Sequence, residues 1–136
     1  IHVFVGGRTS DQERLRFDCF QIEPHYHYID RPHGKQERLE FDSTACGDPF
    51  QWVMERLRTA LPAMLMRAGA IEAARTLDQR EVNAALPIVA ALALNMKQQA
   101  QANWQGLMNL VGAGEFPDSS DDTRKWGEKR FPTGKH

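Results

Sequence analysis

Hydrophobic and polar residues alternate through the first 45 residues of the chain with the two-residue period of β-strands. Extended runs cover residues 1–5, 14–29 and 37–42, and short links join them. The link at 31–34 has proline second and glycine fourth, which is typical of a type I turn. We therefore expect an N-terminal three-stranded antiparallel β-meander within residues 1–45.

The middle run changes the phase of its alternation. Its hydrophobic side chains stand at odd positions up to Cys19 and at even positions from Phe20 onward. One inserted residue reverses the alternation, so a β-bulge near Cys19 and Phe20 would keep both sets on one face. Pro24 lacks an N–H donor and favours an edge position in the sheet.

The period changes to that of a helix at residues 48–68. Asp48 is a good N-cap residue and Pro49 suits the first helical turn. Pro62 should kink this helix or end it, because a proline inside a helix removes a hydrogen bond and clashes with the preceding turn. A short helix is expected at residues 71–77.

A second long helical segment is predicted to begin at Asp78. Residues 84–94 include no polar side chain, too short a run for a bilayer, which needs about 20 residues. A helix that is hydrophobic on all sides is normally buried on all sides, and Pro87 predicts a kink within it. From Ile88 to Val111 the helix would be about 36 Å long, longer than a small domain is wide. We expect its outer half to pack against a second copy of the chain.

These patterns predict an α+β fold in which the sheet is followed by a C-terminal helical hairpin with Pro-kinked helices. A single domain would span residues 1–112, with the sheet in 1–45 and the helices in 48–111. The remaining residues, 113–136, have few hydrophobic anchors among many charges and are expected to form a mobile tail.

Composition excludes several classes of function. The 136 residues carry a formal net charge of −1, without the basic excess that nucleic-acid binding needs. No Gly-rich phosphate-binding loop is present, which argues against a nucleotide cofactor. The absence of a long hydrophobic run argues against a membrane protein. Two cysteines without CxxC spacing favour a reducing compartment, so we expect a cytoplasmic protein.

The segment with most chemical content is the His-x-His pair, His25 and His27. In a strand, residues two apart point the same way with Cα atoms about 6.5 Å apart, so two imidazoles can converge on one metal ion. Glu23 lies about 13 Å from His27 by the same rise and would join them only if the strand bends. We expect His25 and His27 as metal ligands, with Glu23 as a further candidate.

A hairpin register can supply another ligand. If Tyr26 pairs with Leu39, as burial of both requires, then His25 pairs with Glu40 and His27 with Arg38. Two histidines and a carboxylate suit zinc or iron(II), so Glu40 is the expected carboxylate ligand. His25 and His27 would then serve catalysis, with Arg38 holding a small anionic substrate and Tyr26 facing it.

Three interpretations of this face stay open. It is a metal site, a solvated sheet face with a weak Glu40–Arg38 pair, or a metal-free site where a histidine acts as acid or base. At the level of the protein, the first function class is a small metal-binding enzyme or enzyme subunit of unresolved reaction. The alternative is a non-catalytic accessory subunit that docks through its hydrophobic C-terminal helix and tail, as a homo-oligomer or within a larger protein complex.

Overall fold

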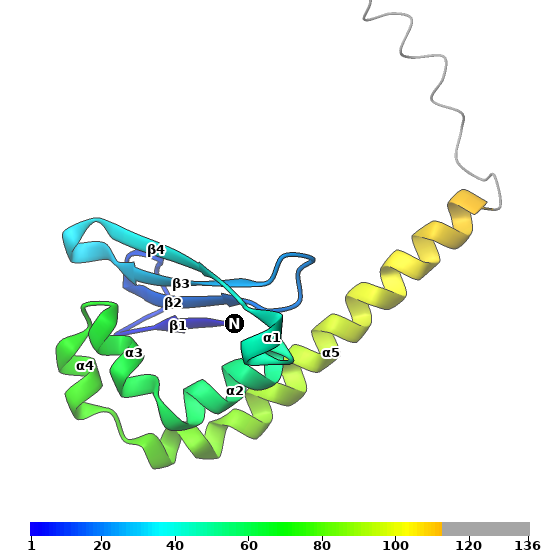
Figure 1. Ribbon diagram of the computed structural model, residues 1–136. Helices are drawn as coiled ribbons and strands as arrows, with labels where there is room; N and C mark the ends of the chain where they lie inside the picture. Colours follow the sequence, from blue (N-terminus) through cyan, green and yellow to red (C-terminus); the bar gives the residue numbers. More distant parts are fainter. Residues whose placement is uncertain (113–136) are drawn as a thin grey trace, which may run out of the picture. The chain divides into compact units, whose positions relative to one another are not determined.

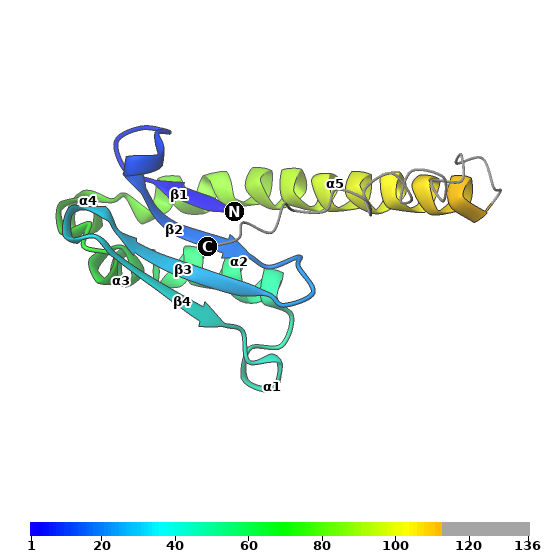
Figure 2. The same ribbon diagram turned by 90° about the horizontal axis from the view of Figure 1, so that it is seen from above.

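The computed structural model describes residues 1–112, which form a mixed α+β fold. By its contacts the chain divides into two compact units, Ile1–Lys97 and Gln98–His136. The expected tail, 113–136, lies outside the described residues. In the first unit, helices cover one face of an antiparallel sheet and leave the other face open (Figures 1 and 2).

The sheet is a four-stranded antiparallel meander in the order β1-β2-β3-β4. The strands are β1 (His2–Phe4), β2 (Glu13–Asp18), β3 (His25–Asp30) and β4 (Lys35–Glu40). Short 3₁₀ helices, η1 (Ser10–Gln12) and η2 (Arg31–His33), precede β2 and β4. The meander was predicted correctly, but with one strand too few.

The missing strand lies within the run 14–29. It is a hairpin of β2 and β3, joined by a loop at residues 19–24, and not one strand with a bulge. Because the chain reverses in this loop, Leu15 pairs with Tyr28 and Phe17 with Tyr26, which places odd and even residues on the same face. The expected bulge at Cys19 and Phe20 is therefore wrong.

The turn that follows β3 is as predicted. The backbone N–H of Gly34 donates to the carbonyl of Arg31 at 3.0 Å, and Gly34 has a left-handed φ of 61° that suits glycine. This turn fixes the register of β3 and β4, in which Tyr26 pairs with Leu39, His25 with Glu40 and His27 with Arg38.

Residues 43–112 form helices, with boundaries that follow local chemistry. Asp48 accepts a hydrogen bond from the backbone N–H of Gln51, and Pro62 lies at the start of a new helix, so the expected segment 48–68 is broken at Ala60. Asp78 likewise accepts from the backbone N–H of Arg80. The helices are α1 (Ser43–Cys46), α2 (Pro49–Thr59), α3 (Leu61–Arg67), α4 (Ile71–Thr76) and α5 (Gln79–Gly112).

A helical hairpin is not confirmed, because the described residues form this series of helices instead. Helix α5 also continues through Pro87 as one element. Its hydrophobic run is not buried on all sides: Ile88 is 65% exposed and Leu92 59%. That expectation is wrong for a single chain, since only one side of the helix, at Val82, Leu86 and Ala93, packs against the core.

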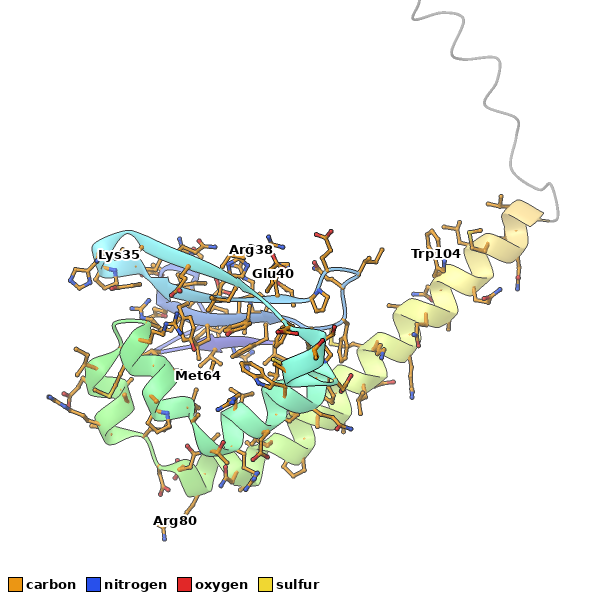
Figure 3. All side chains as sticks on the ribbon, viewed as in Figure 1. Lys35, Arg38, Glu40, Met64, Arg80 and Trp104 are labelled. Atoms are coloured by element: carbon orange, nitrogen blue, oxygen red, sulfur yellow. The ribbon has the colours of Figure 1, made fainter. Side chains whose placement is uncertain are left out.

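The hydrophobic core fills the space between the sheet and the helices. From the strands it receives Leu15, Phe17 and Tyr28, with Phe41 directly after β4; from the helices it receives Phe50, Val53, Leu57, Leu61, Met64 and Leu65. Met64, labelled in Figure 3, lies between α3 and the sheet. Strand β2 buries alternate residues, and its register with β3 places Arg16, Asp18, His25 and His27 on the other face of the sheet.

Candidate metal centre on the open face of the sheet

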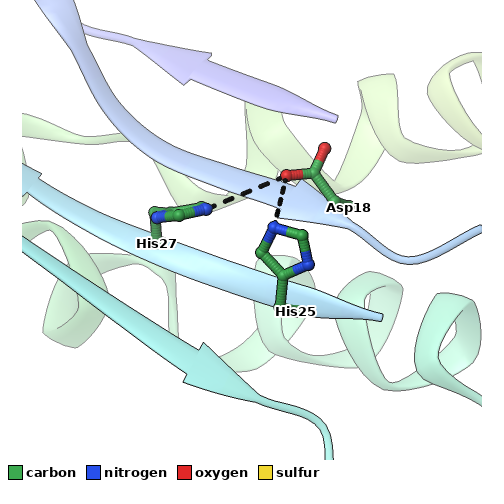
Figure 4. A group of neighbouring side chains, drawn as sticks. All are labelled: Asp18, His25 and His27. Carbon is green, nitrogen blue, oxygen red and sulfur yellow. Dashed lines mark ion pairs between the residues drawn. The ribbon is translucent and has the colours of Figure 1, made fainter. Parts of the chain in front are cut away.

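The open face of the sheet carries polar side chains in register across the strands. Asp18 on β2 pairs with His25 on β3, and Arg16 pairs with His27. This places a carboxylate and two imidazoles next to one another on the side away from the helices (Figure 4). They are partly or fully buried there, since His27 is 7% exposed.

The three side chains converge at their tips. The Nε2 atom of His25 lies 3.3 Å from Oδ2 of Asp18, and the Nε2 atom of His27 lies 4.0 Å from the same oxygen. The two imidazole rings are nearly perpendicular, with centroids 5.0 Å apart. One ligand atom from each residue lies within 4.8 Å of the others, and within residues 1–112 this is the group with metal-ligand geometry.

These distances fit a small metal ion after a modest inward movement. Zinc–nitrogen and zinc–oxygen bonds are about 2.0–2.2 Å, so two ligand atoms of a tetrahedral ion lie about 3.3–3.5 Å apart. The His25–Asp18 separation of 3.3 Å already meets that value. The His27–Asp18 separation of 4.0 Å and the largest separation in the group, up to 4.8 Å, must shorten by about 0.5–1.5 Å, which side-chain rotation supplies.

A hydrogen bond of His25 determines which of its nitrogens is available. Its Nδ1 lies 2.9 Å from the backbone carbonyl oxygen of Glu23, which only accepts, so Nδ1 carries the proton. In neutral His25 the lone pair of Nε2 then points at the Asp18 carboxylate. A metal ion between these two electron-rich atoms would make their approach favourable. Metal-binding histidines commonly have such a carbonyl partner.

His27 has a partner that can adapt. Its Nδ1 lies 3.1 Å from the side-chain amide nitrogen of Gln36, on β4. In this orientation the amide donates, and a neutral ring carries its proton on Nε2, facing Asp18. Rotation of the amide by half a turn presents its oxygen, which accepts from Nδ1 and frees Nε2 for a metal ion. Gln36 therefore suits both protonation patterns.

Burial lowers the pKa of His27 below its ordinary value, and the neighbouring His25 lowers it further. The Asp18 carboxylate acts in the opposite direction but does not outweigh them. Because a metal ion binds the neutral imidazole, this environment favours the protonation state that a ligand needs.

The other expected site residues lie outside the converging group of Asp18, His25 and His27. Arg38 and Glu40 lie on the open face but form an ion pair with each other at 2.7 Å, and both are exposed (Figure 3). Glu23 lies in the β2–β3 loop and meets His25 through its backbone carbonyl. Tyr26 faces the helices, where its ring packs on Trp52 at 5.1 Å. Neither Glu40 nor Glu23 joins the converging group.

Asp18 was missing from the expected site. In a single strand over 14–29 it would lie about 23 Å along the chain from His25, whereas the hairpin makes them direct neighbours. The change of phase was the available clue: a reversal in place of a bulge would have indicated this pairing.

A second polar group lies beside this site. Glu13 is 2% exposed, and its carboxylate binds the guanidinium of Arg16 at 2.6 Å and the imidazole of His2 at 2.5 Å. The hydrogen bond from Arg16 holds the pKa of Glu13 below its ordinary value, against the opposing effect of burial. Arg16 is thus neutralised by Glu13, although it is paired with His27 across the strands.

The fold and the site define an α+β protein with a His–His–Asp cluster on the open face of a four-stranded meander. Residues 1–93 match the family described as Domain of unknown function (DUF7700), and the chain belongs to that family. No curated protein and no solved structure matches the chain significantly. Within residues 1–112, the helices lack the combined length and hydrophobicity needed for a membrane crossing.

Proposed function

We propose that this protein binds one divalent transition-metal ion, zinc or iron(II), through Asp18, His25 and His27. The observation that carries the proposal is the contact between Nε2 of His25 and Oδ2 of Asp18 at 3.3 Å. Because Nδ1 faces a carbonyl oxygen, Nε2 is the ring nitrogen available to share a metal ion with Asp18. Two histidines and one carboxylate are a ligand set typical of zinc and non-haem iron.

Three protein ligands would leave coordination positions for water or a substrate. In that state an ion lowers the pKa of bound water or polarises a carbonyl oxygen, which supports a metal-dependent enzyme or enzyme subunit. The reaction class is left open. Free cysteines at positions 19 and 46 agree with a reducing compartment, and we propose the cytoplasm.

Arg38 is the residue that we propose to hold an anionic substrate. It is paired with His27 in the register of β3 and β4 and is exposed on the same face. Its contact with Glu40 uses only part of a guanidinium that has five N–H donors. A carboxylate or phosphate bound to the metal would find the remaining donors nearby.

The test is metal binding by protein purified without a His tag. Apoprotein is titrated with Zn²⁺ and with Co²⁺, whose absorption spectrum reports the ligand geometry. We expect one equivalent to bind, and Asp18→Asn, His25→Ala and His27→Ala each to weaken binding at least 10-fold. The matched control is Glu40→Gln, which removes the other carboxylate paired with His25 and should leave the affinity unchanged.

The two carboxylates make the outcome decisive. If Glu40→Gln abolished binding and Asp18→Asn did not, the ligand set would be the one expected from sequence and this proposal would be wrong. If the wild type bound metal as weakly as the His25→Ala variant, Asp18 and His25 would be a hydrogen-bonded pair and not a metal site.

We propose as a second function that α5 is an assembly surface, and that a second copy of the chain covers it. Ile88, Leu92 and Met96 are 65%, 59% and 70% exposed and recur every four residues, so they lie on one side of the helix. No charged residue occurs between Glu81 and Lys97. An uncharged hydrophobic stripe can pair with its own copy about a two-fold axis without like-charge repulsion.

In the second unit, Trp104 (Figure 3) is 63% and Val111 53% exposed, so its helical residues are also hydrophobic at the surface. The test is the mass in solution by light scattering. Wild type should be a dimer, and Leu92→Asp with Met96→Asp a folded monomer. Met66→Asp, which places the same charge at a 52% exposed position of α3, is the control and should stay dimeric. A monomeric wild type would rule out self-association.

A further inference from the structure

A cavity of about 290 Å³ lies on the helix-covered side of the sheet, on the opposite face of β3 from the histidines. It is bounded by β3, by α2 and by α3, all within the first unit. The lining residues are Tyr26, Tyr28, Trp52, Arg56, Ala60, Ala63, Met64 and Arg67. They combine aromatic rings, guanidinium groups and small side chains.

Aromatic side chains form one wall of this cavity. The ring of Tyr26 lies 5.1 Å from that of Trp52 and 5.8 Å from that of Tyr28, measured between centroids. Burial raises the pKa of Tyr26, so its hydroxyl stays protonated near neutral pH. Such a wall offers flat surfaces for stacking and hydroxyl groups as hydrogen-bond partners.

Two guanidinium groups stand over this wall. Arg56 lies over the ring of Trp52 at 5.1 Å, and Arg67 lies over the ring of Tyr28 at 4.3 Å. Arg67 is paired with Glu37 at 2.6 Å, whereas Arg56 has no ion pair within the part of the chain described here. Two cations against one carboxylate leave the rim positively charged, so it favours an anionic ligand.

The break between α2 and α3 leaves space for the cavity. Ala60 has a non-helical φ of −133°, and the chain changes direction there before Pro62 starts α3. The residues next to the break that line the cavity are Ala60 and Ala63. Their small side chains leave room that a larger residue would fill.

We propose that this cavity binds a small aromatic carboxylate, with its ring against Tyr26 and Trp52 and its carboxylate on Arg56. A volume of 290 Å³ equals that of about ten water molecules, a fit for a ligand of about ten non-hydrogen atoms. The rings favour a flat ligand and the unpaired guanidinium favours a carboxylate. The site goes beyond the proposed metal function and shares no side chain with it.

Phenylacetate, with ten non-hydrogen atoms, is the probe. Binding is followed by the ¹H–¹⁵N signal of the Trp52 indole, assigned with Trp52→Phe. We expect a saturable shift, at least 10-fold weaker binding in Arg56→Gln, and weaker binding in Ala63→Leu, which narrows the cavity. Arg58→Gln is the matched control, because Arg58 lies on the same helix but is paired with Glu55 outside this cavity.

Neutral 2-phenylethanol tests the charge and cyclohexylacetate tests the ring. Both should bind more weakly than phenylacetate. The proposal is overturned if phenylacetate gives no saturable shift at millimolar concentration, if 2-phenylethanol binds as well, or if Arg56→Gln behaves like Arg58→Gln. Since His25→Ala should bind phenylacetate normally, failure of the metal site and failure of this cavity are distinguishable.

Discussion

Glu13 is an acidic residue buried in the open face of the sheet, where Arg16 and His2 hold its charge. Its folded-state pKa is below the ordinary value of 4.5, mainly through the hydrogen bond from Arg16. A carboxyl group with a lowered folded pKa binds a proton more readily in the unfolded chain. Its contribution to stability is therefore present above pH 4.5 and is lost as the pH falls through the lower folded value.

We predict that Glu13→Gln lowers the free energy of unfolding by about 1–3 kcal/mol at pH 7, the range for lost hydrogen bonds to a charged group. The variant should also lose part of the decrease in stability that is expected as the pH falls below 4.5. Urea unfolding at a series of pH values measures both. Glu55→Gln, at an exposed pair on α2, is the control; equal effects of the two substitutions would contradict a special role for Glu13.

Gly69 is a second residue whose identity is determined by its surroundings. It follows α3 with a left-handed φ of 76°, and a Cβ atom there would lie 2.7 Å from the Asp30 carboxyl group. We predict that Gly69→Ala costs more than the about 1–2 kcal/mol expected for backbone strain alone, because Asp30 must also move.

Gly34→Ala is the matched control for this measurement. Gly34 has a φ of 61°, but nothing lies within 4 Å of an added Cβ atom, so only strain is expected. Thermal unfolding of the two variants isolates the contact with Asp30. A Gly69→Ala variant no less stable than Gly34→Ala would show that Asp30 moves freely.

The histidines of the candidate site could be predicted from sequence, whereas its carboxylate could not. His25 and His27 have strand spacing in any register, so the pair is visible in the sequence itself. Asp18 joins them only through the β2–β3 hairpin, a contact between strands that local spacing does not encode. Glu40 was placed correctly opposite His25, yet Arg38 binds its carboxylate.

At the scale of elements, the β2–β3 loop was the main obstacle to prediction. Phe20 and Ile22 within it continue a strand-like alternation. The structure gives them different surroundings: Phe20 packs on Phe50 at 5.2 Å, while Ile22 is fully exposed. Helices were predicted better, because the caps at Asp48 and the break at Pro62 depend on neighbouring residues alone.

The two aspartate caps allow a prediction about helices. Asp48 caps α2, which buries Phe50, Val53 and Leu57, and Asp42 caps α1, a single turn with no buried residue. We predict that Asp48→Ala costs about 1 kcal/mol. Asp42→Ala should cost less, because α1 can fray without exposing the core. Chemical denaturation measures both, and a larger effect at Asp42 would contradict this ranking.

At the scale of the whole molecule, the fold class was predictable and the burial of helix α5 was not. The order of a sheet followed by helices is visible in the change of period from two to 3.6 residues. The hydrophobic run of α5 was expected to be buried on all sides, but in one chain only its inner side finds partners. A sequence does not state whether burial comes from the same chain or from a copy.

We predict that a chain ending at Lys97 folds and keeps the metal affinity of the full chain. Among the described residues, those that form or border the core end at Ala93, and the first compact unit ends at Lys97. Its melting temperature should lie within a few degrees of the full-length value. The two should be compared as monomers, with Leu92→Asp and Met96→Asp in both. An unfolded shortened chain would show that later residues support the core.

Strand β3 contributes to both proposed sites, because the histidines lie at its odd positions and the tyrosines at its even positions. A slip of one residue against β2 and β4 would exchange the two sets, sending imidazoles into the helical layer and phenols into water. Correct alignment of this single strand is thus a common prerequisite for both proposed sites. Misfolded molecules would lose them together, whereas point variants in correctly aligned molecules lose one at a time.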